Sequence, residues 1–488
     1  MIWTLFTIPA LAGLAAFFMK SRAALRTLLV ATAVAHLALV ITVAATHGAP
    51  RYGAWVGVDA LAIVFLFITS VLFMAASVYA VGYLAAETPG ARTDIEDGEL
   101  FSNEPEAVFV GCLLFFLASM TLVITSRHMG LLWAAVEATT LASAPLIFFH
   151  RHHRSMEAAW KYLMICSVGI GLALLGNLFI AAALGPSADT GLVIDELSAA
   201  APRMNPLWLK AGFIFLVVGY GTKMGLAPLH TWLPDAHSES PSVVSALLSG
   251  ALLNCAFLGI LRAWQLLAAA GLTAFAAPIL VAFGLVSIGL TALFLVRQTD
   301  YKRLLAYSSI EHMGIMALGV GLGGIATYGA LLNAVNHSMA KAALFLVSGN
   351  LLRAFRSKEI ASVTGSMRIA PVSSIIWLCG AFAITGMPPF GVFVSEFTII
   401  RGAIDGGHVV IAVTVLLFLG VAFAAVAASV LSMVQGEPPA GVIREKETLL
   451  TILPPAVLAA VVLMLGLYVP PFISSALHKA SLALEVLQ

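Results

Sequence analysis

Apolar runs of about twenty residues recur along almost the whole 488-residue chain, and short polar segments separate them. Each run is long enough to cross a hydrocarbon core of ~30 Å as an α-helix. The pattern predicts fourteen spans, at 2–19, 24–45, 57–83, 107–125, 128–149, 158–184, 208–232, 241–267, 275–297, 301–322, 325–352, 372–403, 408–434 and 448–469. The chain is 61% hydrophobic with a mean hydropathy of +1.01, which excludes an ordinary soluble protein. We therefore predict an all-α polytopic membrane protein.

Glycine and proline interrupt two of these runs at corresponding places. The seventh run is broken at GLAP (225–228), and the twelfth at TGMPPFG (385–391). Paired interruptions are typical of transporters built from inverted repeats, whose broken helices place free backbone groups beside an ion path. We predict two inverted five-helix repeats, formed by spans four to eight and nine to thirteen. The expected organisation is an N-terminal three-helix segment with an acidic cytoplasmic loop (1–106), a first repeat (107–267), a second repeat (275–434) and a C-terminal helix (435–488).

The charged residues predict the orientation of the chain. Residues 2–19 are apolar and Lys20 and Arg22 follow them, the reverse of the order in a secretory signal peptide. We expect a retained first span with its N-terminus outside. Sixteen of the 25 Lys and Arg residues then lie on the cytoplasmic side and seven on the outer side, as the positive-inside rule requires. The sequence predicts a bacterial inner-membrane protein with both termini in the periplasm.

Composition and spacing argue against several other classes of protein. A formal net charge of +1 gives no electrostatic basis for binding nucleic acid. The longest charged loop, 84–106, is acidic, and it is either a solvated loop, which we favour, or a docking surface. The four cysteines lack paired metal-type spacing, and no pattern binds flavin, nickel, an iron–sulfur cluster or nicotinamide. We predict no cofactor, no metal and no catalytic activity for this chain alone.

Two lysines, Lys223 and Lys341, remain at membrane depth after this assignment. A cation there costs ~2.5–3.5 kcal/mol on insertion scales, so such a residue marks an ion or proton path by default. Glu137 lies near the middle of the fifth span, and a carboxylate and an ammonium on neighbouring helices can pair. Separating them disfavours both charged forms, which makes the pair a usable proton switch. The alternative is a static structural pair.

The second half of the chain offers further titratable groups. His337 precedes Lys341 by four residues and shares its helical face. An imidazole titrates near neutrality and suits a relay, although a hydrogen-bonded packing role is the alternative. Glu396, just after the second break, is the last buried acid that we expect on the path. Glu311 and His312 are additional candidates.

Four polar residues follow the first break: His230, Asp235, His237 and Glu239. They lie at the cytoplasmic end of the seventh span, where they would form an entry funnel for protons. Helix-cap and loop chemistry is the alternative, for Asp235 in particular. His36 stands alone in the second span, and we interpret it as structural.

Three segments resemble a known family: KMGLAPLHTWLPDAHSESPSVVSALLSG (223–250), TDYKRLLAYSSIEHMG (299–314) and NHSMAKAALFLVSG (336–349). They are similar to the antiporter-like subunits of respiratory complex I, which are related to multisubunit cation/proton antiporters and membrane-bound [NiFe] hydrogenases. The resemblance covers spans four to thirteen. Within the family, YKRLLAYSSIEHMG and PPFGVFVSEF are most similar to hydrogenase-4 component F, a membrane subunit of formate hydrogenlyase-type complexes.

The resemblance implies roles for the buried charges. Glu137 and Lys223 would form the family's glutamate–lysine pair, Lys341 would be the central relay, and Glu396 would face the outer half-channel. One departure concerns Asn254, in the sequence GALLN, where relatives often carry a lysine. An amide cannot carry a proton as a charge, so either the relay runs through His337 and water, or pumping is altered. The chain also stops without the long lateral helix of the largest family member.

Three functions follow from these features. The first is a proton-translocating subunit of a redox-driven complex, hydrogenase-4-like or NADH-quinone oxidoreductase-like, whose partners are other membrane subunits and a peripheral hydrogenase or dehydrogenase arm. The second is a subunit of a multisubunit Na⁺/H⁺ or K⁺/H⁺ antiporter. The third is a structural spacer that has lost transport, against which the four retained midplane charges argue.

Overall fold

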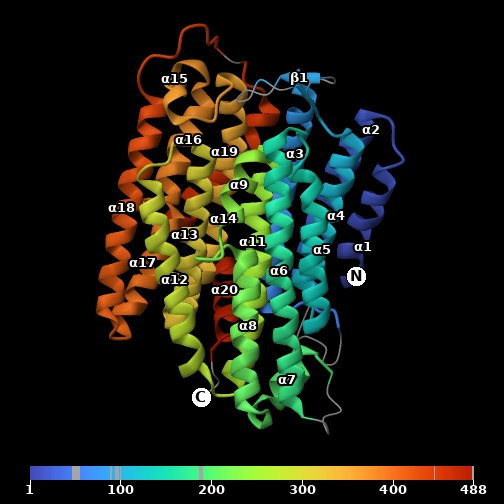
Figure 1. The fold of residues 1–488 in the computed structure, drawn as a ribbon, viewed down its shortest axis with the longest axis vertical. Coiled ribbons are helices and arrows are strands. Elements are labelled where there is room, and N and C mark those ends of the chain that lie inside the picture. Colours follow the sequence, from blue (N-terminus) through green and yellow to red (C-terminus); the bar gives the residue numbers. More distant parts are fainter. Residues whose placement is uncertain are drawn as a thin grey trace.

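The computed structural model describes residues 1–46, 55–87, 91–93, 98, 100–185, 191–444 and 446–485. Long helices stand side by side along one axis, with short elements at both ends (Figure 1). The elements are α1 (Ile2–Ala16), α2 (Arg22–Thr46), α3 (Ala60–Ala86), β1 (Ala91–Thr93), β2 (Leu100–Ser102), α4 (Glu106–Thr125), α5 (Met129–Ile147), α6 (His153–Leu184), α7 (Ile194–Ala200), η1 (Ala201–Arg203), α8 (Pro206–Met224), α9 (Trp232–Glu239), α10 (Ser242–Leu247), η2 (Leu248–Leu252), α11 (Leu253–Ala269), α12 (Thr273–Leu295), α13 (Tyr301–Leu322), α14 (Ile325–Phe355), η3 (Ile360–Ser362), α15 (Ser366–Ile369), α16 (Pro371–Ile384), α17 (Gly391–Asp405), α18 (Val409–Val434), α19 (Leu449–Leu467) and α20 (Pro471–Leu482).

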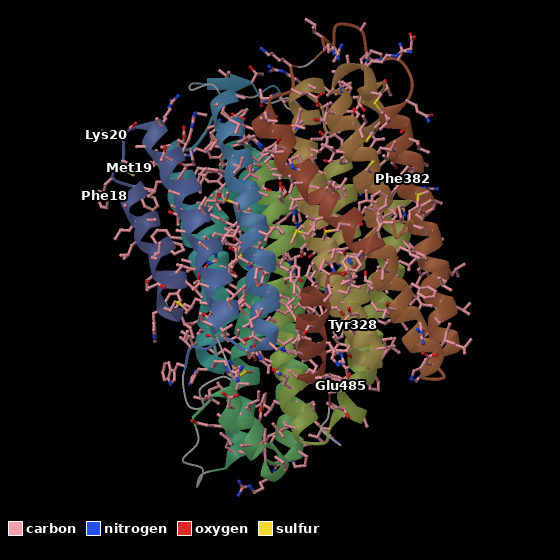
Figure 2. The ribbon with its side chains drawn as sticks, turned by 180° about the vertical axis from the view of Figure 1, so that it is seen from behind. Phe18, Met19, Lys20, Tyr328, Phe382 and Glu485 are labelled. Carbon is pink, nitrogen blue, oxygen red and sulfur yellow. The ribbon has the colours of Figure 1, made fainter. Side chains whose placement is uncertain are left out.

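Within the described ranges, eleven helical segments are long and apolar enough to cross a membrane. The shorter apolar helices α1 and α16 add to them. The expected count of fourteen is not confirmed, because α16 and α17 divide the run 372–403 and α13 carries Lys302, Arg303 and Glu311. Between the two ends of the bundle the outward-facing side chains are mostly carbon, and Phe18 projects outward from the turn after α1 (Figure 2). The chain is a largely helical, multi-pass membrane protein.

Both predicted interruptions break a helix. α8 ends at Met224, and Gly225 adopts a left-handed conformation with φ of 83° before α9 begins at Trp232. α16 ends at Ile384, and Gly386 has φ of 68° before α17 begins at Gly391. Glycine has no Cβ and adopts positive φ at little cost. Each break therefore ends one half-helix inside the bundle and restarts the chain as another.

Small residues bring α6 and α8 into close contact. Gly169 and Gly176 on α6 meet Gly212 and Gly219 on α8, and a Cβ on Gly219 would collide with the carbonyl oxygen of Gly169. Such stripes of small residues allow membrane helices to pack backbone to backbone. This contact brings the C-terminal turn of α8, which carries Lys223, against α6.

α14 is the central helix of the second half. It packs against α3, α13, α16, α17, α19 and α20, and almost every residue of its middle section is buried. β1, β2 and α15 lie at one end of the bundle, called here the β1 end, and α7 lies at the other, the α7 end (Figure 1).

The structure corrects one expectation, about the C-terminal segment, and leaves another, about the acidic loop, as a prediction. A single C-terminal helix was expected after residue 435, whereas the structure has both α19 and α20 there. The segment after α20 is tied to α11, because the Trp264 indole N–H donates to the Leu484 carbonyl at 2.9 Å. Parts of the acidic loop 84–106 lie outside the described residues, so its role stays a prediction.

Candidate functional site

Lys223 lies in the last turn of α8 and has no solvent exposure. Its ammonium donates to the Thr140 hydroxyl on α5 at 2.8 Å and to the Tyr162 hydroxyl on α6 at 2.6 Å. The Tyr162 hydroxyl is also 2.6 Å from the Ser143 hydroxyl. Lys223 is therefore held by neutral oxygen atoms from two neighbouring helices.

Glu137 is half-buried on α5, and it does not form a direct ion pair with Lys223 in the described structure. The Thr140 hydroxyl lies between them and donates to Glu137 Oε2 at 3.4 Å. The Ser167 hydroxyl on α6 donates to Glu137 Oε1 at 2.8 Å. The expected pair is thus an ammonium–hydroxyl–carboxylate chain. Thr140 makes this link, and Tyr162 also holds the ammonium; the sequence analysis identified neither residue.

Lys341 occupies the middle of α14 and is also fully buried. Its ammonium donates to the Leu305 carbonyl on α13 at 2.7 Å. Glu311, one of the additional candidates, is buried on α13, but no ion pair joins it to Lys341 among the described residues. A buried cation is usually paired with an anion, and Lys341 departs from that rule.

His337, His312 and Glu396 follow one another from α14 through α13 to α17. The two imidazole rings lie 5.0 Å apart, and His312 Nδ1 lies 4.0 Å from Glu396 Oε1. His312 Nε2 is 2.8 Å from the Ile384 carbonyl at the end of α16. A carbonyl only accepts, so Nε2 carries the proton and Nδ1 presents a lone pair toward Asn333 and Glu396. His312 is a central member of this group.

The second break makes room for Glu396. A Cβ on Gly386 would collide with the Glu396 carboxylate, which is 7% exposed. Gly386 therefore provides both the positive φ of the break and the space for the carboxylate. Glu396 lies next to the broken backbone, as the pattern predicted.

Asn254 lies between the two halves, in the first turn of α11, which directly follows the π-helical turn η2. Its Nδ2 donates to the Gly250 carbonyl at 2.8 Å and to the Ser338 hydroxyl on α14 at 2.7 Å. Ser338 is the neighbour of His337 in sequence. Asn254 thus joins α11 to the helix that carries His337 and Lys341, in place of a charged group.

Several buried polar atoms in this region have no protein partner among the described residues. They are both ring nitrogens of His237, both ring nitrogens of His337, and the Oδ1 atoms of Asn254 and Asn336. The backbone of Ser249 lies close to the His337 ring, but no hydrogen bond of normal geometry reaches either nitrogen. Buried polar atoms of this kind are normally satisfied by ordered water.

The residues expected to form an entry funnel separate into different environments. His237 is fully buried, and its ring stacks on Phe345 of α14 with centroids 4.9 Å apart. His230 lies in the first break, beside Phe294 and Tyr307. Asp235 forms ordinary ion pairs at the surface, with Lys161 at 3.0 Å and Arg303 at 2.8 Å.

Glu239 ends α9 and accepts a hydrogen bond from Lys358 at 2.8 Å. Burial alone would raise the pKa of its carboxyl, but the charges of Lys358 and Lys302 and the bond from Lys358 hold that pKa below its usual value. His152 and Arg154 lie 3.8 Å from the same carboxylate. Glu239 is therefore an anion at the β1 end, surrounded by cations.

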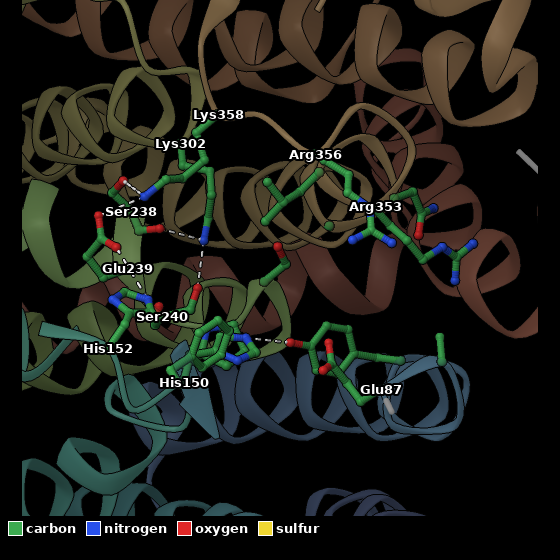
Figure 3. Close-up of a pocket in the computed structure, with 18 of the residues that line it drawn as sticks. Glu87, His150, His152, Ser238, Glu239, Ser240, Lys302, Arg353, Arg356 and Lys358 are labelled. Carbon is green, nitrogen blue, oxygen red and sulfur yellow. Dashed lines mark hydrogen bonds and ion pairs between the residues drawn. The ribbon is translucent and has the colours of Figure 1, made fainter. Parts of the chain in front are cut away.

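Lys302 was not among the predicted site residues, although it is a buried cation. It is 1% exposed at the start of α13, and its ammonium donates to the Ser238 carbonyl at 2.9 Å and the Ser240 carbonyl at 2.6 Å (Figure 3). Those carbonyls lie at the C-terminal end of α9, where a cation is favoured. The apolar pattern does not indicate that residue 302 is buried. It is the second residue of the predicted span 301–322, where a span residue looks the same as a loop residue.

The α7 end contains a second set of buried charges that was not predicted. Arg262 on α11 forms two bonds to the Asp59 carboxylate, at 2.5 and 2.9 Å, and Arg127 pairs with Asp59 and with Asp195 of α7. Burial would raise the pKa of Asp59, but Arg262 and Arg127 hold it well below its usual range. Asp59 also caps α3, so this cluster joins α3, α7 and α11.

The chain matches known proteins over most of its length. A family model described as NADH:quinone oxidoreductase/Mrp antiporter, TM, matches residues 126–421. The hydrogenase-4 component F homolog of Methylacidiphilum infernorum is 38% identical over 356 residues, which cover 72% of this chain and 73% of that protein. Hydrogenase-4 component B of Escherichia coli is 27% identical over 352 residues, which cover 70% of this chain and 49% of that longer protein.

Solved structures share the fold. A chain of the membrane-bound sulfane sulfur reductase, an archaeal respiratory membrane complex, superposes with a TM-score of 0.87 at 21% identity and covers 99% of this chain and 98% of that one. A chain of the Mrp complex from Dietzia sp. superposes with a TM-score of 0.82 at 18% identity, covering 99% and 96%. Both similarities extend over almost the whole chain.

Proposed function

The chain belongs to the NADH:quinone oxidoreductase/Mrp antiporter transmembrane family, and we propose that it is the proton-translocating membrane subunit of a redox-driven complex of the hydrogenase-4 type. Partner subunits transfer the electrons, and this chain moves H⁺ through its middle. One observation carries the proposal. Two buried lysines, Lys223 and Lys341, lie in networks of neutral hydrogen-bonding groups near titratable acids, without a direct ion pair.

The first half supports proton transfer between Lys223 and Glu137. The ammonium donates to Thr140, and the Thr140 hydroxyl donates to the carboxylate, so both bonds point in the direction of transfer. The 3.4 Å step from Thr140 to Glu137 is longer than an ordinary O–H···O bond. Thr140 and Glu137 both lie on α5, so a change of rotamer at either side chain would make or break this step.

The second half supports a path from Lys341 to Glu396. His337 and His312 lie between them, and the lone pair of His312 Nδ1 is on the side of Glu396. Water would complete the path, because the ring nitrogens of His337 require partners that the described protein atoms do not supply. Asn254 connects the halves by hydrogen bonds and water rather than by carrying charge.

We place the β1 end in the cytoplasm and both termini in the periplasm. Lys302, Arg353, Arg356 and Lys358 gather at the β1 end, which agrees with the positive-inside rule. Fourteen crossings, ten of them in the two inverted repeats, then require that α13 crosses the membrane and that α16 and α17 together form one broken span. The partners are other membrane subunits and a peripheral hydrogenase or dehydrogenase arm in a bacterial inner membrane.

The test is redox-driven proton translocation by the purified complex in proteoliposomes. Glu137→Gln and Lys223→Ala should reduce translocation to the leak rate while electron transfer continues or slows. Lys210→Ala is the matched control, since Lys210 lies on α8 but packs its ammonium over Phe275, away from the network. Wild-type stoichiometry in either test variant would refute the proposal.

An antiporter subunit without redox chemistry is the second candidate, favoured by the fold shared with the Mrp complex chain. The same residues would serve it. Proton exchange driven by a Na⁺ or K⁺ gradient, in the absence of any electron donor, would identify this function. Equal rates in Na⁺, K⁺ and choline media would exclude it.

A further inference from the structure

The second helix break lies at the surface of the bundle, whereas the first is covered. Residues 225–227 of the first break are buried, and the Ala227 N–H donates to the Ser287 hydroxyl of α12 at 2.9 Å. In the second break Met387 is 40% exposed, and the two prolines that follow it are exposed as well. The chain therefore covers one break with its own helix α12 and leaves the other open on one side.

The exposed break lies near the middle of its proposed span. α16 contributes 14 residues before the break, and α17 contributes 15 residues after it. Half-helices of these lengths are each about 21 to 22 Å long. The break is therefore about 20 Å from either end of the span, which places it inside a hydrocarbon core of ~30 Å.

The backbone of this break has hydrogen-bond acceptors without donors. The N–H groups of residues 385, 386, 387 and 390 all donate to carbonyls of the chain, and the two prolines between them have no N–H. Among the described residues, no hydrogen bond reaches the carbonyl oxygens of Thr385, Gly386 or Pro388. Irregular backbone of this kind is not found in contact with lipid, because lipid cannot satisfy its polar groups. The break therefore requires a cover that supplies hydrogen-bond donors.

The gap between α19 and α20 meets this break. α19 ends at Leu467 and α20 begins at Pro471, and both helices lie on the side of the bundle that Figure 2 shows. A Cβ on Gly466 would collide with the Pro389 carbonyl oxygen, so the end of α19 lies directly against the second break. Leu467 is 70% exposed and Tyr468 is 61% exposed. The exposed residues of the two gaps form one surface, called here the double-break patch: Met387, Pro388, Pro389, Leu467 and Tyr468.

We propose that the double-break patch is the docking surface for a transmembrane helix of a different membrane subunit. This inference rests on the proposed function only for the existence of such a subunit and not for proton transport. The side chains of the patch are mostly apolar, so a water-filled recess there is unfavourable, whereas an apolar helix can pack against them. That helix carries a donor such as Ser, Thr or Asn at the depth of the break, because the free backbone groups of the break are acceptors.

A second copy of this chain fits the patch less well. Two copies related by a twofold axis along the membrane normal would bring the same patch together at the same depth. Carbonyl oxygens would then face carbonyl oxygens, and Tyr468 is the one side chain of the patch that can donate a hydrogen bond. A different subunit with its own donor side chains satisfies the break better.

Site-specific photo-crosslinking tests this contact in the complete complex in its native membrane. The photoreactive residue p-benzoylphenylalanine replaces Met387 or Tyr468. Leu417 is the matched control position, because it is 66% exposed on the unbroken helix α18. We expect the two patch positions to form a covalent adduct with one other membrane subunit. Mass spectrometry should map that adduct to a transmembrane helix with a hydrogen-bond donor within one turn, and Leu417 should give no such adduct.

Met387→Trp measures how much the patch contributes to assembly. A larger side chain is tolerated against lipid but overfills a packed interface. We expect about tenfold less of the partner subunit to co-purify with Met387→Trp, and no change with Leu417→Trp, while the chain purified alone keeps its thermal stability in both. Adducts between two copies of the chain, adducts with lipid alone, or equal adducts at Leu417 would overturn the proposal. Glu137→Gln should assemble normally, so a failure of docking is distinguished from a failure of proton transport.

Discussion

Arg262 and Lys223 are equally buried cations on packed helices, α11 and α8, yet their surroundings differ completely. Arg262 is 1% exposed and forms two bonds with the Asp59 carboxylate. Lys223 is 0% exposed, and among the described residues its ammonium is bonded to two hydroxyl groups and lies 4.4 Å from the centroid of the Tyr162 ring, with no carboxylate partner. Burial of charge alone therefore does not distinguish a structural group from a transporting one.

The group that each cation contacts distinguishes Arg262 from Lys223. A guanidinium is always protonated and its bidentate pair with Asp59 fixes α11 to α3, so this cluster is suited to a permanent structural role. An ammonium among hydroxyls can lose its proton without leaving an unpaired carboxylate. The same reasoning applies to Lys341 and its single carbonyl partner. We therefore propose that the buried lysines change charge during transport and that the Asp59 cluster does not.

Lys341→Met should have the largest effect on transport and almost none on folding. It removes the group that we propose as the central relay, so redox-driven proton translocation should fall to the leak rate. It also removes the cost of burying a cation without an anion, so thermal stability should be unchanged or higher. Lys479→Met, on the exposed face of α20, is the control. If Lys341→Met lost much of its thermal stability but still translocated protons, Lys341 would have a structural role, like Arg262.

Asp59→Asn should have the opposite effect. It leaves two buried guanidinium groups without their shared carboxylate, and breaking a buried pair costs about 3–5 kcal/mol. The complex should unfold at a clearly lower temperature, while the fraction that remains folded translocates protons at wild-type stoichiometry. Both quantities come from thermal unfolding and proteoliposome assays on one preparation. If Asp59→Asn had normal thermal stability but no proton translocation, the Asp59 cluster would have a role in transport instead of in structure.

Thr140→Val tests the hydroxyl between Lys223 and Glu137. Valine keeps the shape and removes the bridge, so we expect translocation to slow about tenfold, since one charged hydrogen bond contributes ~1.5–3 kcal/mol. Thr139→Val is the control, because the Thr139 hydroxyl bonds only to the Val136 carbonyl of its own helix. Thr140→Ser should restore the rate. An unaffected rate in Thr140→Val would show that protons bypass Thr140.

Asn254→Ala should have a smaller effect, mainly on stability. The lost bond to Ser338 is an interhelical hydrogen bond, for which double-mutant cycles in membranes average ~0.6 kcal/mol. A cycle with Ser338→Ala measures the coupling. Additive effects would mean that the bond contributes nothing, and a large loss of transport would mean that Asn254 carries more than structure.

The smallest effect concerns pH and the Glu239 cluster. The pKa of Glu239 is lowered from 4.5 in the folded protein, so its stabilising contribution is complete above that pH and is lost as pH falls through the folded pKa. Between pH 6 and 8 thermal stability should not depend on this group. In acid, wild type should lose stability more steeply than Glu239→Gln. Parallel acid profiles for the two proteins would contradict this.

Sequence patterns predicted part of this arrangement, for reasons that particular residues illustrate. Gly225 and Pro228, and Gly386 with its prolines, interrupt apolar runs, so both breaks were visible. Lys223, Lys341 and Glu396 were predicted to be buried because they lie far from the ends of those runs. Local pattern and depth are properties of the chain itself.

The rest depends on contacts between distant segments. Thr140 and Tyr162 are ordinary residues of membrane helices. The packing of α6 on α8 through Gly169 and Gly219 places the Tyr162 hydroxyl at Lys223, and α5 supplies the Thr140 hydroxyl. Asp59 and Arg262 are separated by 203 residues, so no local pattern indicates their pairing. Sequence reasoning accordingly identified the costly charges, and the structure identified what compensates them.

The most direct test is the charge state of Lys223 itself. ¹⁵N-lysine solid-state NMR of the chain in bilayers, assigned by comparison with Lys223→Arg, distinguishes ammonium from amine. We expect Lys223 to show both forms, with the amine enriched in Glu137→Gln, and the signal of Lys210, whose ammonium packs over Phe275 outside the network, to be the same in both proteins. A Lys223 signal that stays entirely ammonium in both proteins would contradict the claim that this residue changes its protonation.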